Sequence, residues 1–172
     1  MQMVKNIFIT LTVFWFALLV FMPKQELYFT LEKELLKQDI EINEQSIEEG
    51  VFSLNLIKPV LYVKGIKVAT LEKINIFTLL FYTNINVKSL LLDESLKSYA
   101  PGKIDVANIS HSVFTPFHVN IDAEGSFGIL DGDADLNERK LRLDFKETTK
   151  DIDSIRSNLK KDEKGLYYET SF

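Results

Sequence analysis

The feature that most constrains this chain is a two-residue alternation of apolar and polar side chains that begins near Ile40 and recurs to the C-terminus. Alternation with this period places apolar side chains on one face of a strand and polar side chains on the other. Glycine, proline and asparagine turn signals separate the alternating segments at short intervals. The sequence therefore predicts a mainly β (α+β) fold, in which a curved antiparallel sheet has one apolar face.

Ten apolar residues of the predicted sheet are candidates for either a closed core or an apolar groove. They are Phe52, Leu54, Leu56, Ile74, Ile76, Ile85, Val87, Val119, Ile121 and Phe127. Ordinary core packing explains them, and so does a groove for acyl chains, because each methylene removed from water contributes about 0.8 kcal/mol. The pattern fits both interpretations.

Short helices are predicted beside this sheet. Residues 24–38 form an amphipathic helix in which Leu27, Leu31 and Leu35 recur every four residues, so this stripe should lie against the domain or a membrane surface. Residues 93–99 and 151–160 are the other two predicted helical segments.

The N-terminal 23 residues have a different chemistry from the rest of the chain. Residues 7–22 form an apolar run without a charged side chain, close to the ~17–25 residues that a membrane helix needs. The predicted anchor residues are Ile7, Phe8, Leu11, Phe14, Trp15, Leu18, Leu19 and Phe21. Bulky residues stand where a signal peptidase needs small ones, which favours an uncleaved signal anchor over a cleaved signal peptide.

The charges around this run predict its orientation. Lys5 and the amino terminus put positive charge before the run, which keeps the N-terminus in the cytoplasm. Residues 1–23 are thus expected to be a single-pass anchor, residues 24–38 a helix, and residues 39–172 a β-rich domain. In a bacterium this places the anchor in the inner membrane and the bulk of the chain in the periplasm.

Several classes of function are disfavoured by composition. A net charge of −5 argues against nucleic acid as a partner, and the absence of cysteine excludes thiolate catalysis and thiolate metal sites. The aspartates at 131, 133 and 135 have the spacing that opens a calcium loop, but Leu136 and Arg142 occupy the positions that need glycine and glutamate. No catalytic residue, metal site or cofactor is expected.

Two segments resemble a known family of envelope proteins. The predicted helix is followed by strand segments, which include Leu-Tyr-Val-Lys-Gly-Ile-Lys-Val at 61–68 and Gly-Ser-Phe-Gly-Ile-Leu-Asp-Gly-Asp-Ala-Asp-Leu at 125–136. Together with the ending Gly-Leu-Tyr-Tyr at 165–168, they resemble the type II secretion system protein N family and its AsmA-like relatives. The glycine-broken strand of that family is similar to the pattern of Gly125, Gly128 and Gly132. The resemblance implies an inner-membrane anchor with a periplasmic β-rich domain.

Two functions are expected from these observations. The first is a non-catalytic subunit or adaptor of a type II secretion-like or envelope-assembly system, whose partners are the lipid bilayer and other envelope proteins. The alternative is a lipid-binding or lipid-transfer module with an apolar groove, similar in layout to AsmA-like proteins and to the lipopolysaccharide export protein C type.

Overall fold

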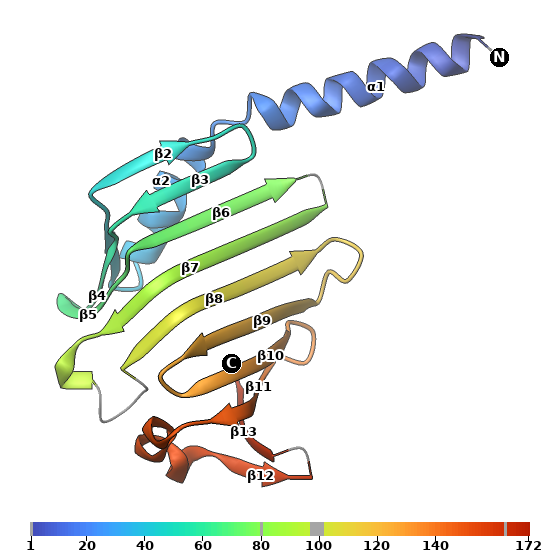
Figure 1. Ribbon diagram of the computed structural model, residues 1–172. Coiled ribbons are helices and arrows are strands. Elements are labelled where there is room, and N and C mark those ends of the chain that lie inside the picture. The colour runs from blue at the N-terminus through green and yellow to red at the C-terminus, as the bar shows by residue number, and fades with distance from the viewer. Residues whose placement is uncertain (1, 80, 97–101, 164) are drawn as a thin grey trace.

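The computed structural model describes residues 2–79, 81–96, 102–163 and 165–172, and shows a mainly antiparallel β protein with two N-terminal helices (Figure 1). Helix α1 spans Gln2–Val20 and projects away from the sheet, whereas α2 spans Lys24–Leu36 and packs on it. Pro23 separates the two helices. The predicted fold class is confirmed in its mainly β, antiparallel character.

Thirteen strands form one sheet, most of which follows the order β7-β8-β9-β10-β11-β13-β12. The strands are β1 (Ile40–Asn43), β2 (Ser46–Glu49), β3 (Ser53–Ile57), β4 (Val60–Val63), β5 (Ile66–Thr70), β6 (Lys73–Leu79), β7 (Tyr82–Leu92), β8 (Lys103–Ser112), β9 (His118–Gly125), β10 (Gly128–Asp135), β11 (Lys140–Thr148), β12 (Lys160–Asp162) and β13 (Gly165–Ser171). At its N-terminal side β7 pairs with β6, β6 with β3, and β3 with β2. The 3₁₀ turns are η1 (Glu94–Leu96), η2 (Lys150–Ser154) and η3 (Arg156–Asn158).

The strand register aligns apolar side chains in two rows that cross the whole sheet. Directly paired residues in antiparallel strands have their side chains on the same face. One row runs through Leu54, Ile76, Ile85, Ile109, Ile121, Gly132, Leu143 and Tyr168. The other runs through Leu56, Ile74, Val87, Ala107, Ala123, Leu130, Phe145 and Leu166. The predicted single apolar face is therefore continuous from β3 to β13.

The row between them lies on the opposite face and is polar. Asn55, Asn75, Asn86 and Asn108 are paired in order across β3, β6, β7 and β8. The Asn75 Nδ2 donates to Asn55 Oδ1 at 2.7 Å, and Asn86 Nδ2 donates to Asn108 Oδ1 at 2.6 Å. A slip of one residue would move these amides to the apolar face, so the two patterns specify the same register.

Two small elements pack on the apolar face, one at each side of the sheet. Tyr28 of α2 packs on Leu54 and Leu56 at the N-terminal side. Ile152 of η2 joins Phe127, Leu130 and Phe145 in a second buried cluster at the C-terminal side. The two buried clusters share no residue, so α2 and η2 pack on separate parts of the apolar face.

Gly128 is the position where the backbone of the β9–β10 turn demands glycine. Its φ is +106°, and an added Cβ would lie 1.5 Å from the carbonyl oxygen of Glu147. That close approach joins the start of β10 to β11 next to a bulge between Ile129 and Leu130.

Three segments differ from the sequence-based expectation. The leucine stripe of 24–38 does not seal the helix to the sheet: Leu27 and Leu31 are about half exposed, and Tyr28 is the buried contact. Residues 151–160 form 3₁₀ turns followed by the start of edge strand β12, which was not predicted. The short helix expected at 93–99 is a 3₁₀ turn at Glu94–Leu96, and residues 97–99 lie outside the described chain.

The register of β9 can be tested by placing the same charge on each face. Ile121→Asp puts a carboxylate on the apolar face, where it lacks solvation, and is expected to lower the free energy of unfolding by about 2–4 kcal/mol. Asn120→Asp, its neighbour on the exposed face, is the matched control and should change it by less than about 0.5 kcal/mol. Urea unfolding of the full chain measures both, and equal midpoints would contradict this register.

Candidate functional site

An apolar trough lies on the apolar face of the C-terminal half of the sheet, where Phe127, Leu130 and Phe145 of the second buried cluster form part of its lining. It has a volume of about 540 Å³, within the ~300–1,000 Å³ typical of ligand sites. Its floor comes from β7 to β11 and from β13, and one wall comes from η3 and the residue after it. Val87, Ile109, Ile121, Leu143 and Leu159 are among its lining residues.

Small side chains in the centre of the apolar rows make the space. Ala107 and Ala123 face each other on β8 and β9, where the flanking strands carry valine and leucine. In the other row Gly132 stands between Ile121 and Leu143, and an added Cβ would lie 2.5 Å from Leu143 Cδ2. Ala107 and Ala123 thus leave a hollow that larger neighbours surround, whereas the space beside Gly132 is already filled by the side chains of Leu143 and Ile121.

The trough is electrically neutral. Among its described lining residues none is charged, and the polar side chains are those of Asn158 and Tyr168. An environment of this kind accepts a hydrocarbon chain and disfavours a charged ligand group, because burying an unpaired charge is costly. Chemically, the arrangement can shield an apolar ligand from water.

The charges of the same strands lie on the opposite face and are paired there. The Arg142 guanidinium contacts Asp144 at 2.7 Å and Asp162 at 2.5 Å, and lies 4.2 Å above the ring of Tyr167. The hydrogen bonds to these two carboxylates raise the pKa of Arg142. These contacts tie β11 to the edge strand β12 without entering the trough.

The three aspartates with calcium-loop spacing also lie on this outer face of β10. Asp131 pairs with Lys146, and Asp133 lies 3.3 Å from Nδ1 of His118. Asp135 accepts hydrogen bonds from the backbone N–H groups of residues 137 and 138, and these bonds lower its pKa. Each carboxylate therefore has its own partner, and within the described chain no three acidic or histidine side chains are arranged to hold a metal ion.

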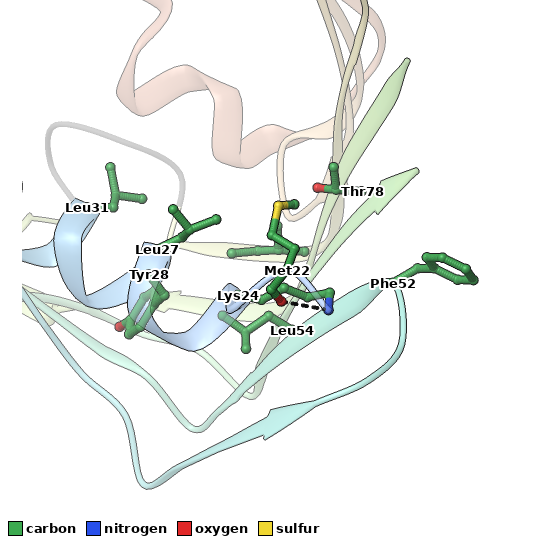
Figure 2. Close-up of a pocket in the computed structure, with 9 residues that line it drawn as sticks. Met22, Lys24, Leu27, Tyr28, Leu31, Phe52, Leu54 and Thr78 are labelled. Carbon is green, nitrogen blue, oxygen red and sulfur yellow. Dashed lines mark hydrogen bonds between the residues drawn. The ribbon is translucent and has the colours of Figure 1, made fainter. Parts of the chain in front are cut away.

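A smaller pocket lies between α2 and strands β3 and β6 (Figure 2). Its volume is about 190 Å³, and Met22, Leu27, Tyr28, Phe52 and Leu54 line it. In Figure 2, Leu27 and Leu31 project from a different side of α2 than Tyr28 does. The pocket is a gap beside the only buried residue of the helix.

Tyr28 fixes α2 to the sheet through both its ring and its hydroxyl group. Its ring is 4% exposed on Leu54 and Leu56, and its hydroxyl donates to Glu44 Oε2 at 2.8 Å. Burial, and then the bond to Glu44, raise the pKa of the Tyr28 hydroxyl. The phenol is thus held neutral as a donor.

The ten predicted groove residues divide among these sites. Val87, Ile121 and Phe127 line the trough, whereas Phe52, Leu54 and Ile76 line the pocket beside α2. Leu56 and Ile74 belong to the buried cluster under Tyr28. Ile85 joins the two regions in the first apolar row, and Val119 pairs with Ala134 on the same face.

Sequence reasoning missed the residues that shape the trough. Ala107 and Ala123 carry too little apolar surface to stand out in an alternation pattern. Leu143 and Tyr168 do alternate with polar neighbours, so the period-two pattern of β11 and β13 could have identified them.

The predicted anchor residues lie on α1 and just after it. Seven of them are exposed: Ile7, Phe8, Leu11, Phe14, Trp15, Leu18 and Phe21. The side chain of Leu19 lies outside the described part of the structure. In the described chain, none of the helices has the combination of length and apolarity that crossing a membrane requires.

Comparison with known proteins yields no relative: no protein family, curated protein or solved structure matches this chain.

The role of Tyr28 can be measured by two substitutions. Tyr28→Phe keeps the ring and removes the bond to Glu44, so it should lower the free energy of unfolding by about 0.5–1.5 kcal/mol. Tyr28→Ala also removes the buried ring and should cost about 3–5 kcal/mol. The neighbouring Phe29→Ala is the control, with an expected loss below about 1 kcal/mol because Phe29 is 41% exposed. Similar losses for the Phe29 and Tyr28 alanine variants would show that Tyr28 is not the docking residue.

Proposed function

We propose that this chain is a non-catalytic, membrane-tethered module that holds acyl chains in the trough, with its β-rich domain in the bacterial periplasm. The observation that carries the proposal is an uncharged hollow of about 540 Å³ on an apolar sheet face that its two packing elements leave open. A closed core would have large side chains where Ala107 and Ala123 stand. Binding rather than catalysis is favoured because the described lining has no carboxylate, histidine, lysine or arginine.

The tether is proposed from the surface of α1. Its apolar side chains are turned to solvent along its length, and the apolar run continues to Phe21, whose N–H bonds the carbonyl of Ala17. An exposed apolar helix of this kind needs a hydrophobic partner, and a bilayer provides one on all sides. The charge of Lys5 before the run supports a cytoplasmic N-terminus.

The adaptor function expected from the resemblance to type II secretion proteins has less support. An adaptor of this fold would offer a sheet edge to a partner strand. The edge strands β1, β2 and β12 are only four, four and three residues long. They carry charges such as Glu41, Glu48 and Lys161, and short charged edges disfavour strand addition.

Filling the trough tests the binding function. Ala107→Phe places a ring in the hollow and should displace about two methylenes of a bound chain, which is ~1.6 kcal/mol or about tenfold in affinity. Titration of the full-length protein with a fluorescent fatty acid measures this loss. Ser110→Phe, which adds the same ring to the outer face of β8, is the matched control and should bind as the unmodified chain does. Equal affinity in all three proteins would refute an acyl chain in the trough.

The tether has a separate test. Leu11→Arg combined with Phe14→Arg puts two charges in the apolar run, each costing about 2.5–3.5 kcal/mol in a membrane interior. The doubly substituted protein should leave the membrane fraction on carbonate extraction. Leu91→Arg combined with Val106→Arg is the control, since these residues are exposed on the sheet, and that protein should stay membrane-bound. Retention of the first variant would rule out α1 as the anchor.

A further inference from the structure

Apolar side chains are concentrated at one end of the sheet. All the turns β2–β3, β6–β7, β8–β9 and β10–β11 lie at this end, because consecutive strands of the main sheet are antiparallel. Val51, Phe81, Val113, Phe114, Phe117 and the C-terminal Phe172 project from it, and we call these six residues the aromatic rim. Their exposed fractions range from 48% for Phe81 to 81% for Phe114.

The rim residues lie on neighbouring turns, and two of their rings are in contact. The rings of Phe81 and Phe114 are 5.6 Å apart, and the N–H of Val113 donates to the carbonyl of Phe81 at 2.9 Å. The carbonyl of Phe117 accepts from the N–H of Leu136 at 2.7 Å, and the N–H of Phe172 donates to the carbonyl of Arg139 at 3.0 Å. These bonds hold neighbouring turns at one level.

The two ends of the sheet differ in chemistry. Residues 50–53, 81–84 and 112–117, which belong to three of the rim turns, contain no charged side chain, whereas the β10–β11 turn carries Glu138 and Arg139. At the other end, the turns carry exposed Lys58, Glu72 and Glu94. Exposed turns without charge are unusual for a surface that faces water, so the rim is suited to an apolar environment.

Helix α1 shows where that environment is. It leaves the domain at the rim end, beside the β2–β3 turn (Figure 1). The ring of Phe16 on α1 lies 5.8 Å from that of Phe52, next to rim residue Val51, and Lys24 after the helix pairs with Glu49 of β2 at 3.5 Å. The helix and the rim therefore point toward the same region.

We infer that the aromatic rim inserts into the interface of the bilayer that holds α1, so that the domain stands on the membrane with its apolar face leading from the surface to the trough. This inference rests on the tether proposed above and adds a second contact with the lipid. The row between the rim and the trough, which includes Val119, Ala134 and Leu141, keeps the path free of charged side chains. A lipid tail could then move from the bilayer to the trough without crossing water.

Single-tryptophan reporters test the rim. Trp15 is the only tryptophan, so Trp15→Phe gives a silent full-length background. In this background, Phe114→Trp reports on the rim, and Ile66→Trp is the matched control. Ile66 is also apolar and is 63% exposed, but it lies near the β4–β5 turn, away from the rim. Both proteins are reconstituted into vesicles of equimolar phosphatidylcholine and phosphatidylglycerol.

The expected result for Phe114→Trp is a blue shift of emission on reconstitution, quenching by brominated acyl chains, and loss of quenching by iodide. The Ile66→Trp protein should show none of these changes. A second outcome is that both proteins float with the vesicles while iodide quenches the tryptophan at position 114 as strongly as the one at position 66. In that case the rim does not dock on lipid, and the inference fails although the tether stands. If neither protein floats, the tether fails, and the inference with it; fatty-acid binding by the trough is measured separately from both.

Discussion

Burial of a single apolar sheet face is the interaction on which this structure depends. Hydrophobic burial is the main favourable contribution to folding, yet this face extends across β3 to β13 and only two small elements pack on it. Tyr28 packs on one side of the face and Ile152 on the other. The trough lies beside the cluster around Ile152, where Ala107 and Ala123 leave space, so the most distinctive feature of the molecule follows from an apolar face that its packing elements do not fill.

The outer face stabilises the same sheet by different means. Amide pairs such as Asn75 with Asn55 satisfy each other between strands, and elsewhere on the same face Arg142 bridges two carboxylates. Such contacts contribute little each at a solvated surface, but they are compatible with one register only. The polar contacts on the outer face thus favour the strand register that makes the other face a continuous apolar surface.

The features proposed to contact a membrane share one direction. The apolar helix α1 and the rim, three of whose four turns lack charge, lie at the same end of the domain. In the proposed arrangement, one bilayer surrounds the helix, takes up the rim and supplies the ligand. A single physical requirement, removal of hydrocarbon from water, then accounts for three separate parts of the chain.

Much of the architecture could be predicted from local patterns. Alternation at Leu54 and Leu56 or at Ile74 and Ile76 predicts strands with one apolar face, because the period of side-chain direction is a local property of the backbone. The 151–160 segment was less predictable. Its face of Ile152 and Ile155 was evident, but a 3₁₀ geometry depends on how closely the chain packs on the sheet.

The mainly β class, the single apolar face and the chemically distinct N-terminal run follow from the sequence alone, since periodicity and charge are local properties of the chain. Strand pairing was needed to show that Ala107 and Ala123 meet at the trough, and that Phe81, Phe114 and Phe172 lie at one end. These groupings depend on strand order and register, which join residues far apart in the sequence. A volume left by small side chains has no local signature, because it is defined by neighbours on other strands.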